Sequence, residues 1–86
     1  MGLESVEIVM EAERLFNIAL PDDKVEHIHT FGTFVDCVNE TCLAKGYKLD
    51  RLEIVETLRK MVSVHLGVPE CKISNESRFI EDLGMN

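Results

Sequence analysis

Residues 3–16 carry a helical repeat, and this repeat constrains the fold more than any other feature of the chain. Apolar side chains recur there at the spacing of an α-helix: Leu3, Val6, Val9, Met10 and Phe16. Glutamates occupy the remaining surface: Glu4, Glu7, Glu11 and Glu13. The pattern predicts an amphipathic helix with an acidic outer face. Because Pro21 cannot continue a helix and disfavours helical geometry at the residue before it, we expect the helix to end near Phe16.

The sequence of residues 24–38 indicates two more helices. Lys24–His29 is long enough for only one or two turns and indicates a short connecting helix. Thr30 is a suitable N-cap for a longer helix that runs to about Val38, in which Gly32 is a slight weakness. The apolar residues of this helix predict its buried face: Phe31, Phe34, Val35 and Val38.

A strongly periodic helix follows a connector. Residues 39–50 lack clear periodicity and contain Gly46, which indicates a connector with or without a helical extension at its start. Asp50 and Glu53 then match a capping box. The apolar positions after them lie at spacings of three and four: Ile54, Val55, Leu58, Met61, Val62 and Leu66. Gly67 predicts that the helix ends in a left-handed conformation.

The rest of the chain, residues 68–86, predicts a long loop held to the core at isolated apolar positions. These positions are Val68, Ile73, Phe79, Ile80 and Leu83. No strand pattern competes with the helical ones. The predicted fold class is therefore all-α, a small bundle of three main helices and one short helix.

Two stretches resemble the two halves of an acyl carrier protein, in inverted order. Residues 3–38 resemble the second half of the family, and residues 54–86 resemble its first helix and the loop that leads to the attachment motif. The matching residues are 3–10, Phe16 and Leu20-Pro21-Asp22 in the first stretch, and Leu66-Gly67-Val68 and 79–86 in the second. The resemblance implies an acyl-carrier-like bundle with its halves circularly permuted.

The resemblance implies one carrier-like domain over residues 1–86. Residues 1–40 resemble the second to fourth helices of the family, 41–51 form a connector, and 52–86 resemble the first helix and the long loop. A second interpretation is a segment cut from a tandem array. Both place Leu52, Val55, Leu58 and Val62 against Val6, Val9, Phe34 and Val38. Because the connector allows closure within one chain, we expect a monomer, with a domain-swapped dimer as a minor form.

The attachment serine of the family is missing from this chain. The resemblance places 4′-phosphopantetheine at the start of the family's second helix, and counting back from Phe16 and from Pro21 reaches Gly2 in both cases. Glycine has no hydroxyl to modify, so no cofactor is expected on this chain. Ser5 is an alternative, because the residues around it imitate the family motif. Its spacing instead favours an ordinary surface or half-buried serine.

The resemblance also implies two sets of binding residues. The family docks its partner enzymes through a surface that corresponds here to Leu3, Glu4, Glu7, Met10, Glu11 and Glu13. It holds acyl chains in a pocket that corresponds to Phe16, Leu20, Val25, Ile28, Phe34, Leu58 and Phe79. The alternatives are a solvated helix face and ordinary core packing. Arg14 and Glu11 depart from the family pattern, which predicts a different partner preference.

Charge indicates the kind of partner. The chain has a net charge of −7, and residues 1–40 hold nine acidic and two basic side chains, whereas residues 41–86 hold seven of each. An acidic surface excludes nucleic acid and fits basic surfaces of acyl-transfer or biosynthetic enzymes. No apolar run is long enough for membrane insertion, and no signal peptide begins the chain, so we expect a cytoplasmic protein.

Metal and catalytic sites are not expected. His27, His29, Cys37 and Cys42 lack the paired spacing of a zinc knuckle. No catalytic signature accompanies any of the three cysteines, and an acidic environment raises the pKa of a thiol. Two functions remain for a protein that is not an enzyme. One is an acyl carrier scaffold of fatty-acid, lipid or polyketide-type biosynthesis, and the other is a carrier-like interaction module without a prosthetic group.

Overall fold

The computed structural model describes residues 3–79, with side chains for all of them except 3–6 and 22. Its helices are α1 (Leu3–Phe16), α2 (Asp22–Val25), α3 (Phe31–Ala44) and α4 (Arg51–Leu66), followed by the 3-10 turn η1 (Glu70–Lys72). Within this range, extended pairing is limited to one antiparallel bridge between Thr30 and Arg78. The prediction of an all-α bundle with three main helices and one short helix is confirmed. No helix among these residues is long and apolar enough to cross a bilayer.

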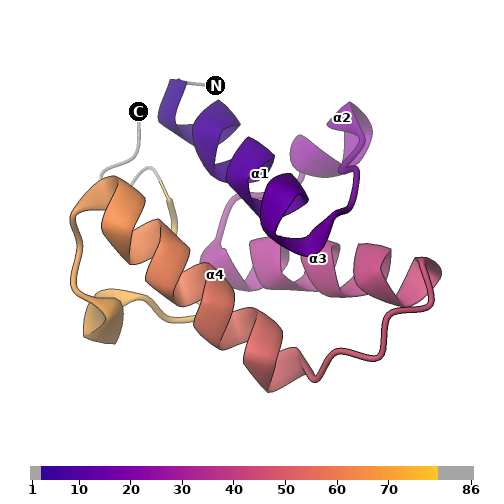
Figure 1. The fold of residues 1–86 in the computed structure, drawn as a ribbon. Helices are drawn as coiled ribbons and strands as arrows, with labels where there is room; N and C mark the ends of the chain where they lie inside the picture. The colour runs from indigo at the N-terminus through magenta and orange to yellow at the C-terminus, as the bar shows by residue number, and fades with distance from the viewer. Residues whose placement is uncertain (1–2, 80–86) are drawn as a thin grey trace.

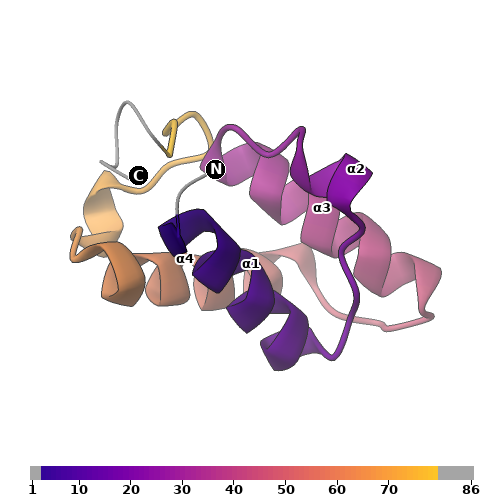
Figure 2. The ribbon, with the colours of Figure 1, turned by 90° about the horizontal axis from the view of Figure 1, so that it is seen from above.

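The core lies where α4 packs across α1 and α3 (Figures 1 and 2). Phe34 and Val38 of α3 and Leu58 and Val62 of α4 are fully buried. The ring of Phe34 meets that of Phe79 edge to face, with centroids 5.8 Å apart. The two halves recognised in the sequence therefore share one core, as expected.

The buried face of α1 differs from the predicted one. Ile8 and Ala12 are buried, Val9 and Phe16 pack at the margin of the core, and Met10 is 61% exposed. At about 100° per residue, Met10 lies on the opposite side of the helix from Ile8. The predicted apolar repeat at Leu3 and Val6 lies outside the described side chains. The helix is thus rotated relative to the expected face, and its outer surface carries an exposed methionine.

The face of α4 was predicted correctly except at its start. Ile54, Leu58 and Val62 are buried at intervals of four residues. Leu52 was expected to pack against the first half but is 62% exposed. It lies two residues from Ile54 and so points away from the core.

Three helix boundaries differ from the predictions. The short helix begins at Asp22 rather than Lys24, because the Pro21 carbonyl accepts hydrogen bonds from the amides of Lys24 and Val25. It ends at Val25 rather than His29, because the amides of His27 and Ile28 bond to carbonyls three residues earlier, as in a turn. Helix α3 continues past Val38 to Ala44. Buried Thr41 and Cys42 extend its core-facing side, with the Thr41 hydroxyl donating to the Cys37 carbonyl at 2.8 Å. The connector between the halves is therefore residues 45–50.

The three main helices end in the same way. Asn17, Gly46 and Gly67 follow them with positive φ values of 52°, 81° and 66°. After each, an amide bonds back to a carbonyl five residues earlier, as in Ile18 to Glu13, at 3.0 Å. This is the left-handed helix ending that glycine favours. The prediction for Gly67 is confirmed, and Asn17 adopts this conformation without being a glycine.

The helix starts show one correct and one incorrect prediction. Thr30 caps α3, and Thr33 completes a reciprocal capping box with it. Asp50 occupies the N-cap position of α4, but its side chain makes no cap hydrogen bond, so the box with Glu53 is absent.

The segment after η1 docks onto the start of α3. The amides of Phe31 and Gly32 donate to the carbonyls of Ser77 and Asn75, each at 2.9 Å. Ile73 and Phe79 are buried on either side of these bonds, as predicted, whereas Ile80 and Leu83 lie outside the described residues. A Cβ atom on Gly32 would lie 2.7 Å from the Asn75 oxygen. Gly32 is therefore required for this docking and is more than a weak point of the helix.

We expect Gly32→Ala to destabilise the protein by about 1–3 kcal/mol, because the added methyl group collides with a backbone carbonyl. This cost exceeds the gain of roughly 1 kcal/mol that alanine brings to a helix interior. Urea unfolding measures the change, with Glu40→Ala at an exposed position of the same helix as the control. Equal or greater stability of Gly32→Ala would contradict the close approach.

Candidate functional site

The position at the start of α1 where the resemblance implies an attachment serine is Gly2 in this chain. Gly2 lies outside the described residues, and it has no hydroxyl that could form a phosphodiester. Ser5 is the third residue of α1, inside its first turn. Its side chain, like those of Leu3 and Glu4, lies outside those the structure describes. The position that the resemblance assigns to phosphopantetheine therefore does not fit that group.

The described part of the predicted docking surface has an exposed apolar centre. Met10 is 61% exposed on the outer side of α1, and Glu7, three residues earlier, is also exposed. Positions three apart on a helix are neighbours on its surface. These two side chains form a patch with one apolar and one acidic member, which we call the Glu7–Met10 patch.

The carboxylate of Glu11 is paired with Arg14 of the same helix. Arg14 Nε donates to Glu11 Oε2 at 3.3 Å, and Arg14 Nη2 contacts Glu11 Oε1. The hydrogen bond from Arg14 lowers the pKa of Glu11, and the same bond raises the pKa of Arg14. Because the Arg14 guanidinium neutralises this carboxylate, the surface of α1 around Glu11 and Arg14 is less acidic than the count of glutamates suggests.

Glu13 is occupied by the chain reversal after α1. Its carboxylate accepts a hydrogen bond from the Leu20 amide at 2.9 Å, and its carbonyl accepts one from the Ile18 amide at 3.0 Å. In the same turn, the Asn17 carbonyl accepts hydrogen bonds from Tyr47 Oη at 3.1 Å and from Lys45 Nζ at 3.3 Å. Glu13 therefore holds the turn that connects α1 to α2.

The residues expected to line an acyl pocket lie in or against the core. Phe34, Leu58, Phe79 and Leu20 are buried, and Phe16, Val25 and Ile28 pack against them at the margin. Their packing role is thus visible in the structure. Whether they open to admit an acyl chain stays a prediction.

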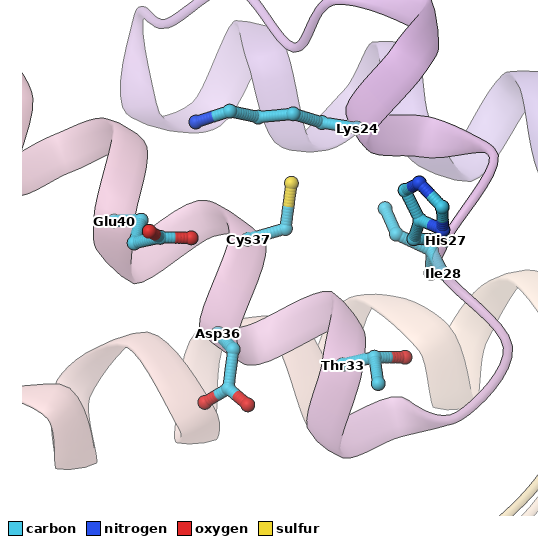
Figure 3. Close-up of a pocket in the computed structure, with 7 residues that line it drawn as sticks. All are labelled: Lys24, His27, Ile28, Thr33, Asp36, Cys37 and Glu40. Atoms are coloured by element: carbon cyan, nitrogen blue, oxygen red, sulfur yellow. The ribbon is translucent and has the colours of Figure 1, made fainter.

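A pocket between α2 and α3 is lined by two of the residues weighed as metal or catalytic candidates, His27 and Cys37 (Figure 3). Its volume is about 240 Å³, and the Cys37 thiol points into it beneath the Lys24 side chain, with His27 alongside. Asp36 points away and pairs with Arg51 at 2.6 Å.

Burial, more than the acidic surroundings, raises the pKa of the Cys37 thiol, with Lys24 opposing and Glu40 adding to the shift. The thiol is therefore protonated at neutral pH and a poor nucleophile. Cys42, also weighed as a zinc ligand, is buried elsewhere along α3, and burial raises the pKa of its thiol as well. Among the described side chains, those of residues 7–79 except 22, no group of three or more His, Cys, Asp and Glu could hold a metal ion.

Sequence reasoning missed four exposed large apolar side chains among the described residues: Leu15, Leu43, Leu49 and Val64. Leu15 on α1 is 45% exposed and Val64 on α4 is 76% exposed. Both line a hollow on the outer side of the α1–α4 contact. The sequence did contain a signal for Leu15 and Val64, because neither belongs to the predicted buried face of its helix.

The chain is similar to acyl carrier proteins over about half of its length. It is 40% identical over 44 residues to the acyl carrier protein of Amoebophilus asiaticus (strain 5a2), covering 51% of this chain and 55% of that protein. It is 47% identical over 39 residues to those of Caulobacter vibrioides (strain NA1000 / CB15N) and Phenylobacterium zucineum (strain HLK1). These matches cover 45% of this chain and 50% and 49% of the relatives. No family model and no solved structure matches the chain.

The chain thus spans about half the length of the curated relatives that it matches. The matches support a relationship to acyl carrier proteins, which are carriers rather than enzymes.

We expect Glu13→Ala to lower the free energy of unfolding by about 1–2 kcal/mol, because it leaves the partly buried Leu20 amide without its acceptor. Glu7→Ala removes an exposed acid from the same helix and should change stability by less than about 0.5 kcal/mol. Chemical denaturation of both variants measures the difference. Equal stabilities would show that Glu13 is a surface charge like Glu7.

Proposed function

We propose that this chain is an acyl-carrier-like domain in circularly permuted order that binds basic surfaces of acyl-transfer or biosynthetic enzymes. Binding occurs through the Glu7–Met10 patch of α1, and the chain carries no prosthetic group in its present form. The observation that carries the proposal is Met10, 61% exposed beside an exposed glutamate. An apolar side chain next to an acidic one fits a partner that offers a small apolar contact within a basic surface.

The arrangement of the halves supports the permuted order. Helix α4 packs against both α1 and α3, so the second half completes the core of the first. The start of α1 and the last described residues lie at the same, left-hand end of the molecule in both views (Figures 1 and 2). A chain opened there and joined through residues 45–50 keeps its core contacts, because the break falls outside the packed helices.

Prosthetic-group carriage is the second candidate function. The relatives are named acyl carrier proteins, and the parent family bears 4′-phosphopantetheine on a serine at the start of its second helix. A carrier of that kind would serve fatty-acid, lipid or polyketide-type biosynthesis. Gly2 favours the first candidate, because this position lacks the hydroxyl that the attachment needs.

We expect the chain to stay unmodified when incubated with a phosphopantetheinyl transferase and coenzyme A. Intact-mass measurement gives the answer, since attachment would add about 340 Da as a covalent modification. A conventional acyl carrier protein in the same reaction is the positive control. A mass increase of that size would overturn the absence of a prosthetic group, and peptide mapping to Ser5 would show that the alternative serine is the attachment site.

We expect Glu7→Lys to weaken binding to an acyl-carrier-dependent enzyme with a basic docking surface, by about fivefold to tenfold at low salt. The fold should be unaffected, because Glu7 is exposed. Glu13 is unsuitable for this test, since its carboxylate holds the Leu20 amide. Titration calorimetry at two salt concentrations measures the affinity.

Glu40→Lys is the matched control, because it makes the same charge change at an exposed position of α3. Equal effects of the two substitutions would mean that net charge alone governs binding. No effect of either would leave the acidic face as a solvated surface.

A further inference from the structure

Two adjoining hollows form a groove along the outer side of the α1–α4 contact. It consists of two hollows, of about 580 Å³ and 340 Å³, that share Leu15 of α1 and Thr57 of α4. The first reaches Leu49 before α4, and the second reaches Val64 near its end. This groove does not include the Glu7–Met10 patch.

The groove is lined by apolar side chains that a monomer leaves in water. Val64, Leu15 and Leu49 are 76%, 45% and 37% exposed, and Phe16 and Met61 lie partly or fully buried along the same lining. Single exposed apolar residues are ordinary, but several gathered in one groove mark a binding surface.

The length of the groove fits a helix. Along α4 it extends from Glu53 to His65. Twelve residue steps of α-helix span about 18 Å, slightly more than three helical turns. A partner helix laid into such a groove contacts it with apolar side chains at intervals of three and four residues.

The charges around the groove differ from those on the rest of the chain. Glu11 at its edge is paired with Arg14, whereas Glu53, the other acid that lines the groove, has no ion pair with a described side chain. Lys48 and Lys60 also line it, and neither forms an ion pair with any side chain that the structure describes, which are those of residues 7–79 except 22. His65 lies at the Val64 end of the groove. The groove therefore has a basic edge on a chain whose net charge is −7.

We propose that the α1–α4 groove binds an amphipathic helix of a partner protein, with an apolar stripe on Leu15 and Val64 and acidic side chains beside Lys48 and Lys60. A second copy of the chain is a poorer occupant, because two molecules of charge −7 repel each other. The inference is independent of the proposed carrier function. The Glu7–Met10 patch requires a basic partner, whereas the groove requires an acidic one.

The test uses the full chain, labelled with ¹⁵N, and two side-chain-stapled helical peptides of about 12 residues, long enough to span the groove. Both peptides carry the same leucine stripe, flanked by glutamates in one and by lysines in the other. We expect the acidic peptide to shift the amide signals of Leu15, Thr57 and Val64. It should bind about tenfold more tightly than the basic peptide at low salt.

Variants separate this groove from other surfaces. Lys48→Glu with Lys60→Glu should reverse the preference between the peptides. Lys72→Glu, an exposed lysine on η1 away from the groove, should leave it unchanged. Val64→Ser should weaken the binding of both peptides and leave the preference for the acidic one unchanged, because it removes apolar contact only.

Three results would overturn the proposal. The first is equal affinity for both peptides or no binding of either. The second is amide shifts at Glu7 and Met10 in place of the groove. The third is tighter binding of decanoate than of the acidic peptide, which would assign the groove to an acyl chain.

Discussion

The rest of the structure depends on one packing contact, that of α4 across α1 and α3. Fully buried side chains from both halves meet there, among them Phe34, Val38, Leu58 and Val62. Each such side chain stabilises the fold by about 1.5–3 kcal/mol relative to exposure in water. Neither half can bury its apolar face without the other. The order of the halves along the chain is therefore secondary, provided that the connector lets them meet.

Hydrogen bonds on two sides of this core hold the C-terminal segment against α3 and the end of α1 against the residues after α3. The start of α3 binds the segment before Phe79, and the residues after α3 bind the Asn17 carbonyl at the end of α1. Glu13 completes the second of these contacts. Glu13 has a structural role and Glu11 is paired with Arg14. Within the described side chains of α1, Glu7 is therefore the glutamate that remains open to a partner, beside the exposed Met10.

The helices could be predicted from periodicity and end signals, but the faces they bury could be predicted only in part. Phe31, Phe34, Val35 and Val38 repeat cleanly and are all buried, whereas α1 has apolar residues on two sides. Tertiary packing chose Ile8 and Ala12, and Met10 was left exposed. The extension of α3 was obscured by Asn39 and Glu40, which interrupt its apolar pattern. The need for glycine at position 32 comes from a carbonyl 43 residues away and has no local signal.

The central claim, that both halves of one chain form one core, is tested most directly by nuclear Overhauser contacts between the rings of Phe34 and Phe79. These rings lie 5.8 Å apart and join the first half to the second. The measurement uses a uniformly labelled sample and an equal mixture of labelled and unlabelled protein with isotope filtering. The account predicts contacts in the first sample and none between chains in the second, at a concentration where the protein sediments as a monomer. Absence of the contacts, or their appearance only between chains, would contradict it.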